Sequence, residues 1–205
     1  EGNFKAYYAG INRCNQALNI IPQLDKANAD LRARLIGEAK FMRAYYYHQL
    51  VRYYGGVPIV DKAFSLTDTD FLSARNTFEE CLNFIVKDLD EAATLLDGKS
   101  LQKGRATKAS ALALKSRMLI YAASDLYDVP TAKAKSKAMA AFGKPELMGF
   151  VSGNRTERWQ KAKAAAKAVL DLSGFGFQLG LTAPVTPEQA ATNYMNQSLA
   201  RNGGQ

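Results

Sequence analysis

A long helix that stops at a pair of glycines is the feature that most limits what this chain can fold into. Residues 37–60 read GEAKFMRAYYYHQLVRYYGGVPIV. Apolar side chains recur there every three or four positions, which places them on one face of an α-helix. Gly55 and Gly56 break the helix, and Pro58 favours an extended backbone before it. The stretch predicts a long amphipathic helix with an extended exit.

Helical periodicity continues on both sides of this stretch. We expect a first helix over residues 4–21, stopped by Pro22, and a second from Asn28 or Asp30 to Tyr54. The expected buried positions share a spacing of three or four residues. They are Ile11, Cys14, Leu18 and Ile21 in the first helix, and Leu31, Leu35, Ala39, Met42, Tyr46 and Leu50 in the second.

The third helix has the clearest start signal. Thr77 and Glu80 form a capping box, in which the threonine oxygen accepts a free backbone N–H and the glutamate returns the bond. Its expected buried face comprises Phe78, Leu82, Ile85, Leu89, Ala92 and Leu96. Thr107 is expected to cap a fourth helix, whose stripe comprises Leu112, Lys115 or Ser116, Leu119, Ala122 and Leu126.

The remaining third of the chain is less regular. Residues 128–155 contain two prolines and several glycines, which predict an irregular insertion with a short helix over 132–142. A further helix is expected from Thr156 or Glu157 to about Leu172. A short extended piece over 175–179 and a final helix over 187–200 complete the expected elements.

These elements predict an all-α fold. Successive helices with alanines at their expected contacts favour helical hairpins that stack side by side. The period of about 34 residues that defines a tetratricopeptide array does not recur. We therefore expect an irregular tetratricopeptide-like stack in which residues 1–205 form a single helical scaffold domain cut from a longer protein, with 128–155 as its irregular insertion.

The net charge of +8 admits two interpretations. It suits a patch for nucleic acid or an anionic membrane surface, and it also suits solvated helix faces. The lysines of residues 133–144 and 161–167 are interleaved with alanines, as on exposed helix faces, and the chain lacks the alternation of aromatic and basic residues that single-stranded nucleic-acid grooves use. Solvated faces are the favoured interpretation, and no nucleic-acid partner is expected.

No set of residues predicts catalysis or a cofactor. Cys14 and Cys81 lack the paired spacing of a metal site, so each is expected to be a small buried hydrophobe, with a disulfide between them left open. His48 is the single histidine, and no acid or nucleophile is placed to work with it. We expect no catalytic residues, no metal ligands and no cofactor.

Sugar binding requires flat aromatic rings flanked by polar side chains. Trp159 and the run Tyr45–Tyr47 are the candidates, but neighbouring helical positions point in different directions. Packing is therefore favoured for Trp159 and Tyr46. Glu38 and Arg43 are expected to form a structural ion pair or to cap a helix. The ligand-binding residues stay unassigned.

The long helix and its neighbours resemble the SusD/RagB family. The signature segments are Gly37–Tyr47, Leu50 and Tyr54–Val60, and flanking matches follow in order at Ile11–Leu18, Arg75–Cys81, Gly104–Thr107, Leu119–Ser124 and Arg158–Ala162. The sequence departs from the family pattern at Lys40, where an arginine is common, and over residues 128–155. A lipidated N-terminal cysteine and the family's C-terminal portion, which supplies much of its ligand surface, do not occur in these residues.

The resemblance implies a non-catalytic, lipid-anchored protein on the surface of the outer membrane. Such proteins capture polysaccharides, oligosaccharides or, in some members, peptides, and they pass them to a SusC-type TonB-dependent transporter. The alternative is an intracellular helical-repeat adaptor that holds a partner peptide in a groove.

Overall fold

The structure is a computed structural model, which describes residues 2–24, 28–64, 68, 73–99, 102, 104–172 and 186–199. It divides into two compact units, a larger one over Glu1–Asp171 and a smaller one over Leu172–Gln205. The single domain expected over residues 1–205 stays a prediction. The extended piece expected over 175–179 lies outside the described residues.

Helices make up the described part of both units, and no strand occurs in it. The larger unit contains long helices α1 (Gly2–Ile20), α2 (Ala29–Tyr54), α3 (Phe78–Leu95), α4 (Lys108–Ala123) and α7 (Arg155–Leu170), and the short helices α5 (Val129–Lys135) and α6 (Lys137–Ala141). Short 3-10 turns lie at Ile21–Gln23, Asp125–Tyr127 and Pro145–Leu147. The smaller unit contains α8 (Pro187–Leu199). In the described ranges, no helix has the length and apolar character needed to cross a membrane.

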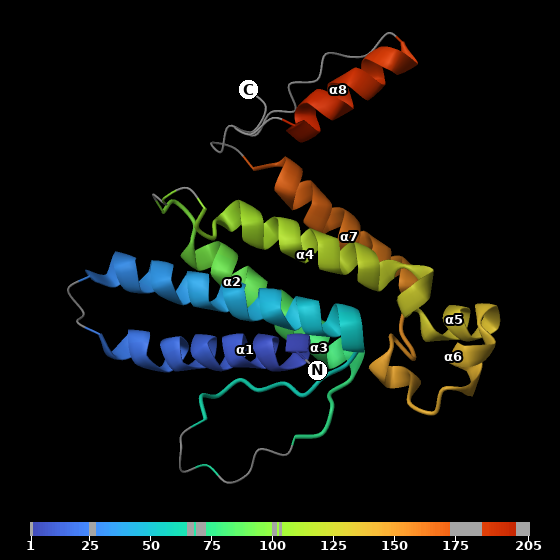
Figure 1. The fold of residues 1–205 in the computed structure, drawn as a ribbon, viewed down its shortest axis with the longest axis horizontal. Helices are drawn as coiled ribbons and strands as arrows, with labels where there is room; N and C mark the ends of the chain where they lie inside the picture. The colour runs from blue at the N-terminus through green and yellow to red at the C-terminus, as the bar shows by residue number, and fades with distance from the viewer. Residues whose placement is uncertain are drawn as a thin grey trace. The chain divides into compact units, whose positions relative to one another are not determined.

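Each long helix of the larger unit packs against the next. α1 lies along α2, α2 along α3, α3 along α4, and α4 along α7 (Figure 1). Antiparallel neighbours of this kind are helical hairpins, and their succession without a regular repeat is tetratricopeptide-like. The predicted all-α, irregular tetratricopeptide-like stack is confirmed.

The helix starts follow the capping signals in the sequence. Thr77 Oγ1 accepts from the backbone N–H of Glu80 at 3.1 Å, and Glu80 accepts from the N–H of Thr77 at 2.8 Å, so the capping box is present. Asn28, not Asp30, caps α2. α7 starts at Arg155, slightly earlier than expected, because the side chain of Asn154 accepts from the N–H of Thr156 at 2.9 Å.

The expected buried face of α3 is confirmed at all six positions. In α2 the expected stripe is confirmed in part. Leu50 is buried and Tyr46 packs against the core, but Leu31 and Met42 are exposed, whereas Tyr47 and Val51 are buried. α2 lies between α1 and α3, so its buried surface is wide and includes polar side chains. In the fourth stripe Leu126 is exposed, because α4 ends at Ala123.

The Gly-Gly pair is a point of close approach between three segments. Gly55 has a φ of 71°, and an added Cβ would lie 2.2 Å from the carbonyl oxygen of Leu147. A Cβ on Gly56 would lie 2.1 Å from the carbonyl oxygen of Asn76. The glycines therefore stop α2 and also admit the backbones of its neighbours.

The insertion over 128–155 is folded more tightly than expected. The short helix expected over 132–142 is two helices, because Ser136 interrupts it and caps α6. The insertion is tied to the end of α2, where Gly56 donates to the carbonyl of Leu147 at 2.6 Å.

Candidate ligand-binding surfaces

A buried ion pair joins the first three helices. Arg43 of α2 donates to the two carboxylate oxygens of Asp88 on α3 at 2.7 and 2.8 Å, and a third nitrogen donates to Asn15 of α1 at 2.8 Å. All three residues are buried. Burial alone would lower the pKa of Arg43, but the hydrogen bonds and charge of Asp88 outweigh it and raise the pKa. The arginine stays charged and acts as a structural link.

The same network holds the extended segment that follows the Gly-Gly pair. Asn15 donates to the carbonyls of Val60 and Lys62, each at 2.9 Å. The Tyr47 hydroxyl accepts from the N–H of Val60 at 2.7 Å, and the Tyr8 hydroxyl donates to the carbonyl of Pro58 at 2.7 Å. Helix side chains thus replace the strand partners that an extended segment normally uses.

The histidine and the two cysteines, which are the side chains considered for catalysis or metal binding, are buried in the packing of the helices. His48 is buried, with its Nδ1 2.7 Å from the sulfur of Met118, and burial, followed by the charges of Arg52 and Arg117, lowers its pKa to about 4. Cys14 and Cys81 are buried free thiols, so no disulfide joins them. Burial raises the pKa of Cys14 to about 11, which keeps it protonated. Within the described ranges, no cluster of His, Cys, Asp or Glu is arranged to hold a metal ion.

The best-formed hollow is a groove between α3, α4 and α7, with a volume of about 530 Å³. We call it the α3–α4–α7 groove. Its floor is apolar and includes Leu82, Val86, Leu119 and Phe150, and its rim is polar and includes Asn83, Lys115, Asn154, Glu157 and Lys161. The size and the combination of an apolar floor with a few polar groups are typical of ligand sites.

The aromatic ring in this groove is not open to a ligand. Phe150 is only 7% exposed, and the guanidinium of Arg158 lies over its ring at 4.6 Å. The same guanidinium pairs with Asp128, and Lys115 pairs with Asp90 at 2.6 Å. The groove therefore offers apolar side chains and occupied charges, a combination better suited to a peptide-like chain than to a sugar ring.

A second candidate surface is aromatic. It consists of Phe4 on α1, Arg52, Tyr53 and Tyr54 at the end of α2, and Tyr121 on α4, and we call it the aromatic surface. The exposed fractions are 54% for Tyr53, 46% for Tyr121, 38% for Phe4 and 37% for Tyr54. A shallow hollow lined by Gly2, Phe4, Lys5 and Tyr54 opens beside it.

The rings of the aromatic surface form a connected series. Phe4 and Tyr54 meet edge-to-face with centroids 5.3 Å apart, and Tyr54 and Tyr53 are 6.4 Å apart. Arg52 lies 4.8 Å above the Tyr53 ring and donates to the Tyr53 hydroxyl at 2.7 Å. That hydrogen bond, followed by the charge of the Tyr53 hydroxyl, raises the pKa of Arg52. α4 meets α2 beside this position, because Met118 contacts His48 one turn before Arg52.

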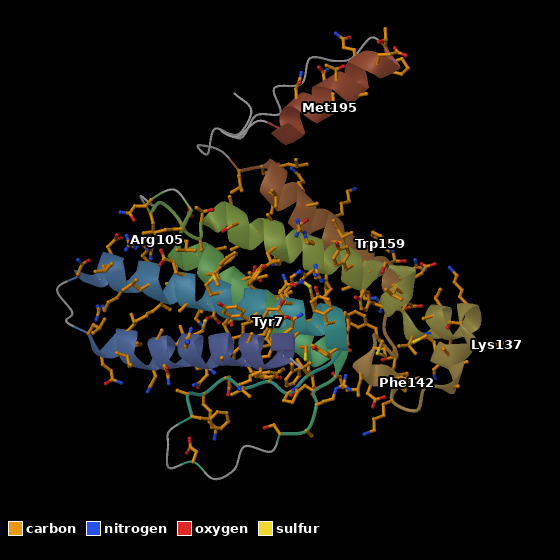
Figure 2. The ribbon with its side chains drawn as sticks, in the orientation of Figure 1. Tyr7, Arg105, Lys137, Phe142, Trp159 and Met195 are labelled. Atoms are coloured by element: carbon orange, nitrogen blue, oxygen red, sulfur yellow. The ribbon has the colours of Figure 1, made fainter. Side chains whose placement is uncertain are left out.

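The residues considered for sugar binding from the sequence lie elsewhere. Trp159 was expected to pack in the core, but it is 44% exposed on α7 (Figure 2). The reason is that α7 buries Ala162 and Ala165 instead. Tyr46 packs against the core, as expected, and its ring centroid lies 6.3 Å from that of Tyr7. Tyr47 is fully buried, whereas Tyr45 is exposed.

The expected pairing of Glu38 with Arg43 is wrong. Glu38 accepts instead from Arg105 at 2.7 Å, and Arg43 pairs with Asp88. Sequence analysis also missed the aromatic surface, because its residues come from three helices. The signal that marks it is charge: α1, α4 and residues 39–54 of α2 contain no acidic side chain.

Comparison with known proteins identifies relatives. Residues 1–120 match the SusD-like family described as "Starch-binding associating with outer membrane". A SusD-like protein of Formosa agariphila is 30% identical over 115 residues, which cover 56% of this chain and 22% of that protein.

Solved structures show the same similarity. A SusD-like protein of Bacteroides fragilis superposes with a TM-score of 0.64 at 27% identity, covering 91% of this chain and 29% of that one. A structure described as a laminarin-binding SusD-like protein superposes with a TM-score of 0.54 at 27% identity, covering 64% of this chain and 28% of that one. The chain thus spans less than a third of the length of these relatives.

Proposed function

This chain belongs to the SusD-like family, and from that membership we propose that the protein containing it captures glycans at the cell surface and delivers them to a SusC-type TonB-dependent transporter. The observation that carries the proposal is the family match over residues 1–120, which include α1, α2, α3 and most of α4. In this proposal the helices are the scaffold of a binding protein, and the protein performs no chemical reaction on its ligand.

Two further observations support a glycan as the ligand. A relative at 27% identity is described as laminarin-binding. The aromatic surface offers exposed tyrosine rings beside an arginine, the pairing of flat apolar faces and hydrogen-bond donors that sugar rings require. Oligopeptides are the second ligand class of the proposal, and the α3–α4–α7 groove is the surface suited to them.

The proposal places the protein on the outer membrane through an N-terminal lipid anchor. The family description supports association with the outer membrane. The buried network around Arg43 supports a scaffold role, because it fixes the extended segment after α2 in one position. A fixed scaffold lowers the entropy lost when a ligand or a transporter binds.

The test uses the full-length protein. Isothermal titration against a panel of polysaccharides and oligopeptides should give saturable binding to at least one polysaccharide. Affinity purification from the native membrane should recover a TonB-dependent transporter barrel with it. Binding to no glycan and no peptide, together with the absence of a barrel, would show that the proposal is wrong.

The intracellular adaptor is the competing hypothesis, and the α3–α4–α7 groove is the observation in its favour. Fractionation of native cells separates the two hypotheses. A lipid-modified protein in the outer-membrane fraction supports glycan capture, whereas a cytoplasmic protein without lipid supports the adaptor.

A further inference from the structure

The aromatic surface lies in a part of the molecule that lacks acidic side chains. The sequence contains 19 Asp and Glu residues, yet none occurs in α1, in α4 or in residues 39–54 of α2. The same segments carry several cations, namely Lys5, Arg13, Lys40, Arg43, Arg52, Lys108, Lys115 and Arg117. Lys40, Arg43, Lys108 and Lys115 pair with carboxylates from outside these segments. The excess positive charge near the rings therefore comes from Lys5, Arg52 and Arg117.

The cations beside the aromatic rings have no carboxylate partner among the described residues. Arg52 contacts Tyr53, and neither Lys5 nor Arg117 forms an ion pair in that part of the chain. Lys5 lines the shallow hollow with Phe4 and Tyr54. Arg52 and Arg117 are both exposed. Arg52 follows His48 by one turn of α2, and Arg117 adjoins Met118, whose sulfur lies 2.7 Å from His48 Nδ1, so both arginines belong to the place where α2 and α4 meet.

We propose that the aromatic surface, together with Lys5 and Arg117, binds an acidic glycan. The exposed rings of Phe4, Tyr53 and Tyr121 stack on the apolar faces of pyranose units, and the guanidiniums pair with carboxylate or sulfate groups along the chain. The inference rests on the proposed function, because it names the glycan class and the surface for the same capture step.

The charge complementarity decides between a neutral and an acidic glycan. A neutral sugar needs donors and acceptors in similar numbers, and carboxylate side chains are the usual acceptors for its hydroxyls. None is present in α1, in α4 or in residues 39–54 of α2, the segments that contribute side chains to this surface. Arginine presents a planar fork of donors that fits carboxylate and sulfate oxygens in pairs. The surface is therefore built for an anionic partner.

Single-stranded nucleic acid also combines stacking with negative charge, so it is the main competitor. The family match favours the glycan, because Phe4, Lys5, Arg52, Tyr53, Tyr54 and Arg117 all lie within residues 1–120, which match a starch-binding family. The experiment therefore also measures the affinity for single-stranded DNA that carries the same charge as the acidic glycan.

The experiment compares polymers that differ only in charge, using the full-length protein. Polygalacturonate is titrated against its fully methyl-esterified form, and dextran sulfate against dextran. We expect at least one charged polymer to bind more tightly than its neutral counterpart, with an affinity that falls as salt is raised because the ionic contacts are screened. The first pair tests carboxylates and the second tests sulfates.

Variants assign that binding to the surface. Arg52→Gln and Arg117→Gln are each expected to raise the Kd for the charged polymer by about tenfold, since each removes a charge-assisted hydrogen bond. Tyr53→Ala is expected to weaken binding by a similar factor through the loss of stacking. Lys163→Gln and Trp159→Ala are the matched controls, because Lys163 and Trp159 are exposed on α7, and they should leave the Kd unchanged.

Each other result overturns the inference in a distinguishable way. Binding of neutral glycans alone, or equal affinity in the Arg52 and Arg117 variants, leaves glycan capture intact and refutes this site. Tighter binding of single-stranded DNA of matched charge assigns the surface to nucleic acid. Absence of binding to any glycan refutes the inference, and it refutes the proposed function as well if no oligopeptide binds and no transporter barrel is recovered.

Discussion

Helix α2 carries two arginine–tyrosine pairs with opposite roles. Arg43 and Tyr47 are buried, and both are fully engaged with α1, α3 and the extended segment after the Gly-Gly pair. Arg52 and Tyr53 are exposed and contact each other. The residue types are the same, so the difference comes from the neighbours. α3 places Asp88 opposite Arg43, whereas no carboxylate among the described residues pairs with Arg52, whose partner is the Tyr53 hydroxyl.

The comparison shows which contacts an arginine needs in order to have a buried structural role. A buried guanidinium is tolerated when a carboxylate meets it with two hydrogen bonds and its remaining donors are satisfied. Arg43 has both, through Asp88 and Asn15. An exposed guanidinium without a carboxylate keeps its water and its donors, which are then open to a ligand.

The largest effect is expected from removing the charge opposite Arg43. Asp88→Asn should lower the free energy of unfolding by about 3–5 kcal/mol, because it leaves a buried arginine without its counter-charge. Urea denaturation followed by circular dichroism measures the loss. The double variant Arg43→Met, Asp88→Leu should be more stable than Asp88→Asn, since no charge then remains buried. A double variant as unstable as the single one would contradict this account.

The free energy of unfolding is expected to depend on pH by about 3 kcal/mol through His48, which is also buried in α2. Each pH unit between its unfolded and folded pKa values contributes about 1.4 kcal/mol. The pKa of His48 is lowered from 6.5 to about 4 in the folded protein. Between these values the unfolded chain binds a proton that the folded chain does not. Stability from the neutral imidazole is therefore complete above pH 6.5 and is lost as the pH falls towards 4.

Urea titrations at pH 7, 6 and 5 measure this dependence. His48→Gln is the control, because it removes the titrating group and should flatten the profile across that range. A wild-type profile that is already flat would mean that His48 has the same pKa in the folded and unfolded protein.

Removing the hydroxyl of Tyr47 or of Tyr53 gives a matched comparison of their contributions to stability. Tyr47→Phe should lower the free energy of unfolding by about 1–3 kcal/mol, because the N–H of Val60 loses its acceptor inside the protein. Tyr53→Phe removes a hydroxyl whose partner is the exposed Arg52, so no measurable loss is expected. Hydrogen exchange at the Val60 amide should accelerate in the first variant only.

The sequence predicts the buried positions of α3 better than those of α2, because α2 also buries polar side chains. Every buried position of α3 except Cys81, Asp88 and Ala93 belongs to the apolar stripe read from the sequence. The buried face of α2 includes Arg43 and His48, which an apolar pattern assigns to solvent. Their burial depends on Asp88 and Met118, which are distant in sequence.

The candidate site was less predictable than the fold for the same reason. Trp159 is the residue that sugar binding suggests first, yet it lies on α7, a helix that contributes no ring to the aromatic surface. Phe4, Tyr53 and Tyr121 are brought together by the packing of three helices. The absence of acidic residues from α1, α4 and residues 39–54 of α2 is visible in the sequence, but its meaning depends on knowing that these segments share a surface.

The smallest effect on stability is expected where the effect on binding is largest. Arg52→Gln should leave the urea midpoint unchanged, because the guanidinium is exposed and has no carboxylate partner among the described residues. The same substitution is expected to weaken binding of an acidic polymer by about tenfold. Measuring both quantities on one preparation separates a ligand-binding arginine from a scaffold arginine. A lowered midpoint in Arg52→Gln would place Arg52 in the scaffold with Arg43, and the contrast between the two pairs would be lost.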